Sequence, residues 1–192
     1  MKKVLFILLM LTLFFFGKTQ SLPPKELHFN HLYIEDGLPD RSIISLLQDR
    51  DGYMWIGTGN GLVRYDGYKP KVYKFGIEGF LPITFLYEDR KGILWAGTAY
   101  ARLYRYDRTK DDFIPYDLRL TDSLSLTQGY ISGIHDDPSG NLWILLGGRG
   151  VSASIHYLNT KTEECKHYSK KEKGAHSINA GELYNIFEDS RG

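Results

Sequence analysis

Residues 49–68 read DRDGYMWIGTGNGLVRYDGY, and residues 89–109 read DRKGILWAGTAYARLYRYDRT. The two stretches begin 40 residues apart and place aspartate, glycine, tryptophan and tyrosine in the same order. A third copy, ISGIHDDPSGNLWILLGG, spans residues 131–148, and the beginning of a fourth, LYNIFEDSRG, spans residues 183–192. The chain therefore contains an internal repeat, and a repeat of this length decides the fold.

Two landmarks recur in the repeat. An Asp-x-x-Gly turn is present in all four units, and in the three complete units a tryptophan follows three residues after the glycine. The residues concerned are Asp49, Gly52 and Trp55; Asp89, Gly92 and Trp95; Asp137, Gly140 and Trp143; and Asp189 with Gly192. The aspartate can accept hydrogen bonds from backbone N–H groups ahead of it, and glycine adopts positive φ without steric cost. We therefore expect these residues to have a structural role, with each tryptophan packed between neighbouring sheets.

The segments between the turns have the pattern of β-strands. In the first unit SIISLLQD, YMWIGT, LVRYD and KVYKF are short, rich in β-branched and aromatic residues, and separated by Gly, Asp and Pro. Four strands in 40–50 residues are the size of a propeller blade. The sequence predicts an all-β fold, a β-propeller fragment of about three four-stranded blades plus the first strand of a fourth. WD-repeat blades differ, because there aspartate directly follows the tryptophan.

The repeat also suggests limits for each segment. We expect a signal peptide at residues 1–21, followed by an N-terminal closing strand and lead-in at 22–40, with Leu27 to Ile34 as the closing strand. Blades 1, 2 and 3 are predicted at 41–80, 81–128 and 129–180, and a truncated fourth blade begins at 181–192. The signal peptide is predicted because Lys2 and Lys3 precede a run of 13 residues that is apolar except for Thr12, followed by a polar segment. An uncleaved N-terminal anchor is the alternative.

Composition and motif spacing exclude several classes of function. The formal net charge of +1 lacks the basic excess that nucleic-acid binding requires, so no nucleic-acid partner is expected. The chain has one cysteine, Cys165, so an internal disulfide is excluded. None of the six histidines has zinc-site spacing, and the sequence has no nucleophile elbow or phosphate-binding loop. We therefore expect no catalytic residue, no metal and no cofactor in this chain.

The motif resembles the two-component regulator propeller repeat, which typically reads D-x-x-G-x-(L/I/M)-W-I-G-T, then a short turn, then G-L-x-x-(Y/F)-(D/N). The first unit matches at Asp49, Gly52, Met54, Trp55, Ile56, Gly57, Thr58, Gly61, Leu62, Tyr65 and Asp66. The third unit departs from the pattern at Leu145 and Leu146. The resemblance extends over residues 27–192, and the lead-in is similar to the N-terminal opening of periplasmic sensor halves of Bacteroidetes hybrid two-component systems.

This resemblance implies a function and a location. The chain would be exported to the periplasm, as the N-terminal fragment of a hybrid sensor histidine kinase anchored in the inner membrane. The kinase, the membrane span and the remaining blades would lie outside it, and the parent would be a homodimer. The implied function is signal transduction in response to a small-molecule or oligosaccharide ligand. Among these ligands, the resemblance favours a carbohydrate breakdown product. The alternatives are a secreted propeller-type carbohydrate-active enzyme and a protein-interaction scaffold.

Candidate ligand-binding residues are those in which the units differ. The loops after the second strand of each unit lie on one face of a propeller, together with the connections between units. Aromatic platforms with Arg and Asn donors suit sugars or anionic groups. The unrepeated polar and aromatic residues there are Asn60, Tyr100, Arg102 and Arg149 in the loops, and Asp40, Arg41, Phe80 and Tyr130 in the connections.

Overall fold

The computed structural model describes residues 31–75, 80–118, 129–148, 153–169, 178 and 182–189. Contacts divide the chain after His31, and the fold described below belongs to the unit that begins at Leu32. The predicted signal peptide lies outside the described residues. Within the ranges given above, no helix is long and apolar enough to cross a membrane.

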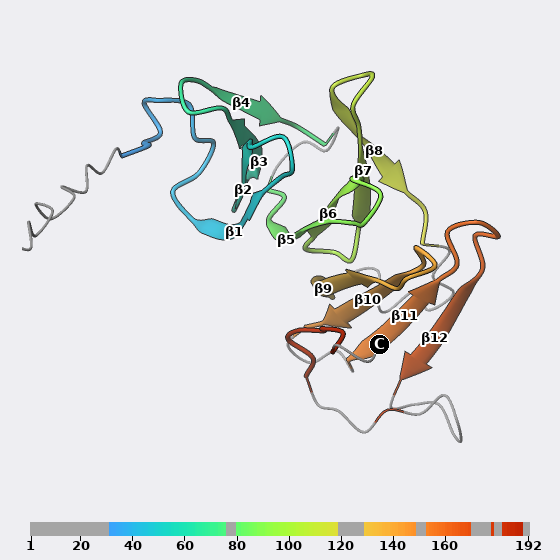
Figure 1. The fold of residues 1–192 in the computed structure, drawn as a ribbon. Coiled ribbons are helices and arrows are strands. Elements are labelled where there is room, and N and C mark those ends of the chain that lie inside the picture. Colours follow the sequence, from blue (N-terminus) through green and yellow to red (C-terminus); the bar gives the residue numbers. More distant parts are fainter. Residues whose placement is uncertain are drawn as a thin grey trace, which may run out of the picture. The chain divides into compact units, whose positions relative to one another are not determined.

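The described residues form three antiparallel sheets of four strands each, drawn in Figure 1. The strands are β1 (Ile43–Gln48), β2 (Met54–Thr58), β3 (Gly61–Tyr65), β4 (Pro70–Tyr73), β5 (Ile83–Glu88), β6 (Leu94–Thr98), β7 (Leu103–Asp107), β8 (Asp112–Tyr116), β9 (Tyr130–Asp136), β10 (Leu142–Gly147), β11 (Ser154–Leu158) and β12 (Cys165–Ser169). Spatial order follows chain order in every sheet. We call the sheets blades 1, 2 and 3. The expected all-β propeller fold is confirmed, and the blade limits suggested from the sequence stay predictions.

The two ends of the repeat are irregular. Of the predicted closing strand, residues 27–30 lie outside the described residues, and residues 31–34 are not in a strand. Residues 182–189, where the fourth blade was expected to begin, also have no assigned strand. They nevertheless run beside blade 3, because the Leu183 carbonyl and the Ile186 side chain each lie 3.5 Å from where a Cβ on Gly147 or Gly133 would be.

Each of the three Asp-x-x-Gly turns that the structure describes in full is closed by its own aspartate. Asp49 Oδ1 accepts hydrogen bonds from the backbone N–H groups of Asp51 and Tyr53, at 3.0 and 2.9 Å. Gly52 has φ +89°, which a residue with a side chain rarely adopts. Asp89 and Asp137 accept the corresponding bonds in blades 2 and 3.

The second carboxylate oxygen links the turn to the tryptophan. Trp55 Nε1 donates to Asp49 Oδ2 at 2.8 Å, and the side chains of both residues are buried. Trp95 makes the same bond to Asp89 at 3.0 Å. In blade 3 the corresponding oxygen of Asp137 is instead taken by Asn141 Nδ2 and the Tyr157 hydroxyl. The turn, the start of the second strand and the tryptophan ring are thus fixed by one carboxylate in blades 1 and 2.

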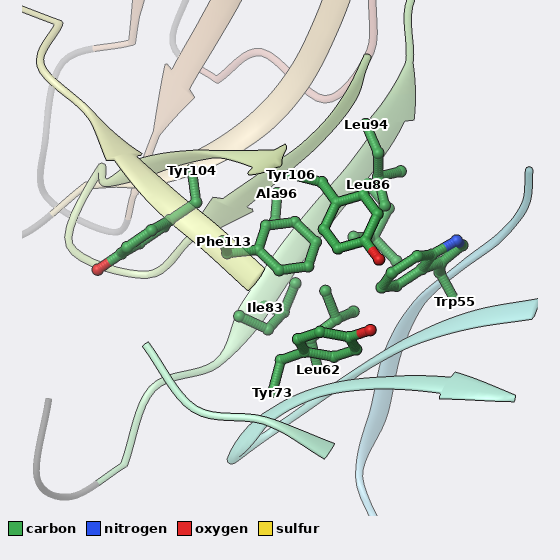
Figure 2. Packing of buried hydrophobic residues seen from close by; sticks show 10 residues of the cluster. All are labelled: Trp55, Leu62, Tyr73, Ile83, Leu86, Leu94, Ala96, Tyr104, Tyr106 and Phe113. Carbon is green, nitrogen blue, oxygen red and sulfur yellow. The ribbon is translucent and has the colours of Figure 1, made fainter. Parts of the chain in front are cut away.

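The first tryptophan builds the core between blades 1 and 2. Trp55 is fully buried, and its ring centroid lies 5.0 Å from that of Tyr106 and 5.7 Å from that of Phe113. Those two rings belong to β7 and β8, and Figure 2 shows them facing Trp55 and Tyr73 of blade 1. Edge-to-face aromatic contacts of this kind contribute about 0.5–1.5 kcal/mol beyond the area that they bury. Neither blade could bury these rings alone.

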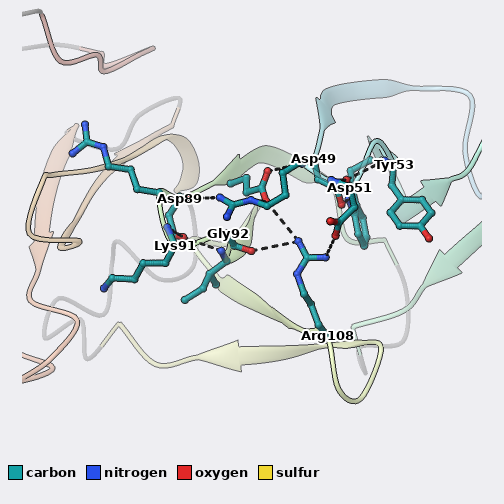
Figure 3. A network of polar contacts seen from close by, with 12 residues as sticks. Asp49, Asp51, Tyr53, Asp89, Lys91, Gly92 and Arg108 are labelled. Atoms are coloured by element: carbon teal, nitrogen blue, oxygen red, sulfur yellow. Dashed lines mark hydrogen bonds and ion pairs between the residues drawn. The ribbon is translucent and has the colours of Figure 1, made fainter.

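A polar network joins the same two blades at their aspartate turns (Figure 3). Arg50 donates its backbone N–H and its Nε to the carboxylate of Glu88, at 2.9 and 2.7 Å. Arg108 pairs with Asp51 and reaches Glu88 at 3.5 Å. Between blades 2 and 3, the backbone N–H of Arg90 likewise donates to Asp136. The repeat therefore places a backbone donor of one blade on an acid of the next.

Close approach of the inner strands requires a residue without a side chain. A Cβ on Gly97 would lie 2.6 Å from Ile131 of blade 3, and one on Gly57 would lie 2.8 Å from the Ile83 carbonyl oxygen. Blade 3 departs from this pattern, because Leu145 takes the glycine position and its cross-strand partner is Gly133. A Cβ on Gly133 would lie only 2.9 Å from the Leu145 side chain. The glycine has moved to the opposite strand of the pair.

Blade 3 also contains a stacked pair of imidazoles, of which His156 is buried and His167 partly exposed. His156 and His167 are cross-strand partners whose rings stack with centroids 4.7 Å apart. His156 is 3% exposed, its Nε2 lies 3.0 Å from Ser154 Oγ, and its Nδ1 lies 4.0 Å from Cys165 Sγ. Burial and, to a smaller extent, the neighbouring His167 lower the pKa of His156 to about 4.

The carboxylate of Asp49 can be tested by substitution. Asp49→Ala leaves the buried Trp55 indole and two turn N–H groups without their acceptor, so we expect a loss of about 2–4 kcal/mol in the free energy of unfolding. Asp66→Ala is the matched control, because Asp66 also accepts two backbone N–H bonds, but in an exposed turn. We expect that control to lose less than about 1 kcal/mol in urea unfolding. Equal losses would contradict the role assigned to the indole bond.

The buried imidazole predicts a pH dependence of stability. Because the folded pKa of His156 is about 4 and the ordinary value is 6.5, the unfolded chain binds the proton more tightly than the folded chain. The stability that the neutral ring provides is complete above pH 6.5 and is lost as the pH falls toward 4, by roughly 3 kcal/mol. Urea unfolding of the chain and of His156→Gln between pH 4 and 7 measures this effect. A parallel dependence in both proteins would refute it.

Candidate functional site

The predicted ligand-binding residues lie where the second strand of a blade turns into the third, at the strand end remote from the aspartate turns. We define the loop face as the β2–β3 turn (residues 59–60), the β6–β7 turn (99–102) and the connections at 38–42, 80–82 and 129–130. Arg149 lies outside the described residues, so the equivalent loop of blade 3 is left out of the description.

The blade 1 part of the loop face is held by short polar contacts. Asp40 Oδ1 accepts the backbone N–H of Ser42 at 2.6 Å, and the Ser42 carbonyl accepts the N–H of Gly59 at 2.9 Å. A Cβ on Gly59 would lie 3.2 Å from the Asp40 carboxylate. The next residue, Asn60, is exposed, and its backbone N–H is bonded to Thr58 Oγ1. Asp40 and the Asn60 turn are therefore neighbours.

The blade 2 part contains an unusual turn. Tyr100 and Ala101 both have positive φ, +68° and +51°, as in the type I′ hairpin turn that Asn-Gly usually occupies. A residue with a side chain pays about 1–2 kcal/mol for this left-handed conformation. The methyl group of Ala101 is buried, whereas Tyr100 is 45% exposed. The turn thus accepts backbone strain while it presents an aromatic ring to solvent.

The connection at residues 80–82 links the blade 1 part of the loop face to the blade 2 part. The backbone N–H of Gly61 donates to Leu81 O, and that of Ala99 donates to Pro82 O. Ala99 also forms an isolated β-bridge with Tyr130. The Asn60 turn, the Tyr100 turn and Tyr130 therefore follow one another across the loop face.

The remaining predicted residues, Arg41, Arg102, Phe80 and Tyr130, lie on the same face. Arg41 and Arg102 are exposed, and Phe80, beside the connection, is 61% exposed. Tyr130 is partly buried and approaches Gly147, where a Cβ would lie 3.9 Å from its ring. The loop face therefore offers aromatic surface, amide and guanidinium donors, and one carboxylate. Among the described residues, no group of three or more His, Cys, Asp or Glu could hold a metal ion.

A second concave feature was missed by the sequence reasoning. A groove of about 780 Å³ lies between the outer face of blade 3 and the segment 182–189. It is lined by His135, Asp137, Pro138, Trp143, Ile155, Tyr157, Lys166, Tyr168, Ile186, Phe187 and Glu188. The sequence signal that could have indicated it is the departure of unit 3 from the repeat at Leu145 and Leu146. In the structure Trp143 is only partly buried, whereas Trp55 and Trp95 are buried.

Comparison with known proteins adds the family of the repeat. Residues 37–60 match the family model described as two component regulator propeller. The chain contains this repeat. It is also 44% identical over 39 residues to histidine kinase P4 of Formosa agariphila, a match that covers 20% of this chain and 3% of that protein.

Solved structures with a similar fold are extracellular domains from B. thetaiotaomicron. The domain from the proposed hybrid two component system BT4673 matches with a TM-score of 0.64 and 22% identity, over 80% of this chain and 20% of that one. The extracellular domain of the proposed hybrid two component system BT3049 matches with a TM-score of 0.61 and 23% identity, over 81% of this chain and 22% of that one. The chain thus spans about a fifth of these structures, and the likeness is one of fold.

The strained turn predicts a stabilising substitution. Tyr100→Asn replaces a bulky residue at positive φ by one that adopts this conformation more readily, so we expect the free energy of unfolding to rise by about 0.5–1 kcal/mol. Tyr68→Asn is the control, because Tyr68 is 93% exposed and lies in the turn before β4. Thermal unfolding should show an increase for the first substitution only. A decrease for Tyr100→Asn would mean that the ring contributes packing.

Proposed function

We propose that the chain is the N-terminal part of an exported sensor domain of a hybrid two-component system, and that it binds a carbohydrate ligand at the loop face. The kinase that would receive the signal lies outside these residues. The repeat, the match to a histidine kinase and the extracellular domains of similar fold support the sensor role. The carbohydrate preference rests on the chemistry of the loop face alone.

The strained Tyr100 turn is the observation that carries the binding proposal. Strained backbone conformations of non-glycine residues cluster at binding and active sites. Here the strained turn presents an exposed aromatic ring, and backbone contacts of the neighbouring Ala99 join this turn to Pro82 and Tyr130. Aromatic side chains commonly line small-molecule sites, and we expect this ring to stack on the apolar face of a sugar. Arg41 and Arg102 add guanidinium donors, which suit hydroxyl or carboxylate groups of a saccharide.

Binding can be separated from folding at this position. Titration calorimetry of the chain with a panel of neutral and uronate-containing oligosaccharides should give one class that binds. We expect Tyr100→Asn to weaken that binding at least tenfold while it leaves the melting temperature unchanged or higher, because a nucleobase stacked on an aromatic ring contributes about 1–3 kcal/mol and a stacked sugar should contribute similarly. Tyr68→Asn should bind as the unsubstituted chain does.

The outcome also distinguishes the alternatives. Loss of the oligosaccharide with appearance of shorter products during the titration would favour a carbohydrate-active enzyme over a sensor. Equal affinity of the Tyr100→Asn and unsubstituted chains would remove the loop face as the binding site. An absence of binding across the panel would overturn the carbohydrate proposal for this chain. It would favour the hypothesis that the chain is a protein-interaction scaffold.

A further inference from the structure

The β2–β3 turn contains Asn60–Gly61, the one Asn-Gly pair in the sequence. Asparagine is a thermolabile residue, and an asparagine followed by glycine is the pair most prone to spontaneous deamidation. In that reaction the backbone nitrogen of the second residue attacks the side-chain amide carbon of the first, and glycine has no side chain that would hinder the approach. The turn therefore places a reactive pair on the loop face.

The side-chain amide of Asn60 is free to react. Asn60 is exposed, and within the part of the chain that the structure describes no hydrogen bond holds its side chain, although its backbone N–H donates to Thr58 Oγ1 at 3.1 Å. The other described asparagines each use their side chain in a hydrogen bond, and none precedes a glycine: Asn141, Asn159 and Asn185. Asn60 thus differs from them in both respects.

The nucleophile of this reaction is held by the connection to blade 2. Gly61 is buried, and its N–H donates to Leu81 O at 3.2 Å, the long end of the range for such bonds. While Gly61 N donates to Leu81, it cannot bond to the Asn60 amide carbon, so the turn must first separate from residues 80–82. Local openings of loops need much less free energy than global unfolding. The fold therefore slows the reaction without preventing it.

We propose that Asn60 is a site of spontaneous deamidation, and that separation of the β2–β3 turn from residues 80–82 sets its rate. In the open state Gly61 N loses its proton and bonds to Asn60 Cγ, and the side-chain nitrogen leaves as ammonia. The product is a succinimide ring, in which Gly61 N is bonded to both carbonyl carbons of residue 60. One water molecule then opens the ring. Cleavage of the bond to Cγ gives aspartate, and cleavage of the bond to the main-chain carbon gives isoaspartate.

Both products alter the loop face. Thr58 is fully buried, and its Oγ1 accepts the Asn60 N–H and donates to Gly61 O at 2.9 Å. Isoaspartate lengthens the main chain by one carbon between these two contacts, so the turn cannot keep both. Aspartate leaves the backbone unchanged but adds a negative charge close to Asp40, whose carboxylate lies 3.2 Å from where a Cβ on Gly59 would be. The modification does not depend on the ligand proposed for this face.

The test follows Asn60 in the folded chain. The 192-residue chain is incubated at mildly alkaline pH and sampled with trypsin, which cuts after Arg50 and Arg64 and so releases residues 51–64. Fragment masses measure the conversion of residue 60 from amide to acid, and the same peptide, excised before incubation, is the unprotected reference. We expect Asn60 to convert at least tenfold faster than Asn159, and more slowly in the chain than in the free peptide.

A substitution in the connection tests the role of the opening. Pro82→Gly makes the segment next to Leu81 more flexible, so we expect it to speed the conversion of Asn60 at least threefold. Pro138→Gly is the matched control, because Pro138 lies in the aspartate turn of blade 3. Equal acceleration by both substitutions would refute the control by residues 80–82, as would equal rates in the folded chain and the free peptide. A chain that stays unconverted while the peptide is consumed would overturn the proposal, and so would equal rates at Asn60 and Asn159.

Melting temperatures then compare the products. Asn60→Asp supplies the charge with an unchanged backbone, whereas the isoaspartate form, purified from the incubated chain, has the longer backbone as well. We expect the isoaspartate form to melt below Asn60→Asp, because it loses the contacts to Thr58. Asn60→Gln, incubated in parallel, should keep its melting temperature, since glutamine would have to form a six-membered ring.

An isoaspartate form that melts together with Asn60→Asp would contradict the effect assigned to the turn. None of these measurements uses a saccharide, so a failure here is distinct from a failure of the ligand proposal.

Discussion

The hydrogen bond from a buried indole N–H to a turn carboxylate, which Trp55 and Trp95 each donate, is the interaction on which the packing of blades 1 and 2 depends. Asp49 closes its turn with one oxygen and orients Trp55 with the other. The oriented Trp55 ring is the surface against which Tyr106 and Phe113 of the next blade pack. The Asp49 side chain thereby connects the local geometry of a turn to the packing of two sheets. Neither sheet could bury its aromatic residues alone.

Much of the fold could be predicted, because the forces that produce it are local or repeated. Asp-x-x-Gly specifies its own turn through bonds to residues two and four positions ahead, and the aromatic and β-branched runs specify the strands. The irregular conformation of residues 182–189 could not be predicted from those rules. Their sequence has the strand pattern, yet a strand also needs a hydrogen-bonding neighbour, which no residue pattern within the segment reveals.

The candidate site shows a different limit. The sequence could indicate that loop residues such as Asn60 and Tyr100 differ between units. It could not indicate that Tyr100 and Ala101 adopt positive φ, because Tyr-Ala has no preference for that conformation. The blade 3 groove was missed for a related reason. Trp143 looks equivalent to Trp55 in sequence, but its exposure depends on what packs over it, which is a long-range property.

Blade 3 has its glycine on the first strand of the pair, Gly133 opposite Leu145, whereas blades 1 and 2 have it on the second strand, at Gly57 and Gly97. This difference bears on how such repeats diverge. In blade 1 a leucine at position 57 would clash with Ser45 across the strand pair, because a Cβ there would lie 2.1 Å from Ser45 Oγ, and it would also clash with the Ile83 carbonyl of blade 2, 2.8 Å away. A glycine at position 45 would relieve only the first of these clashes, and it would remove the hydrogen bond from Ser45 Oγ to the Ile83 carbonyl. The position of the glycine is therefore coupled to the neighbouring blade as well as to the opposite strand, so a blade of the blade 1 type cannot change to the other arrangement by substitutions within its own strand pair alone.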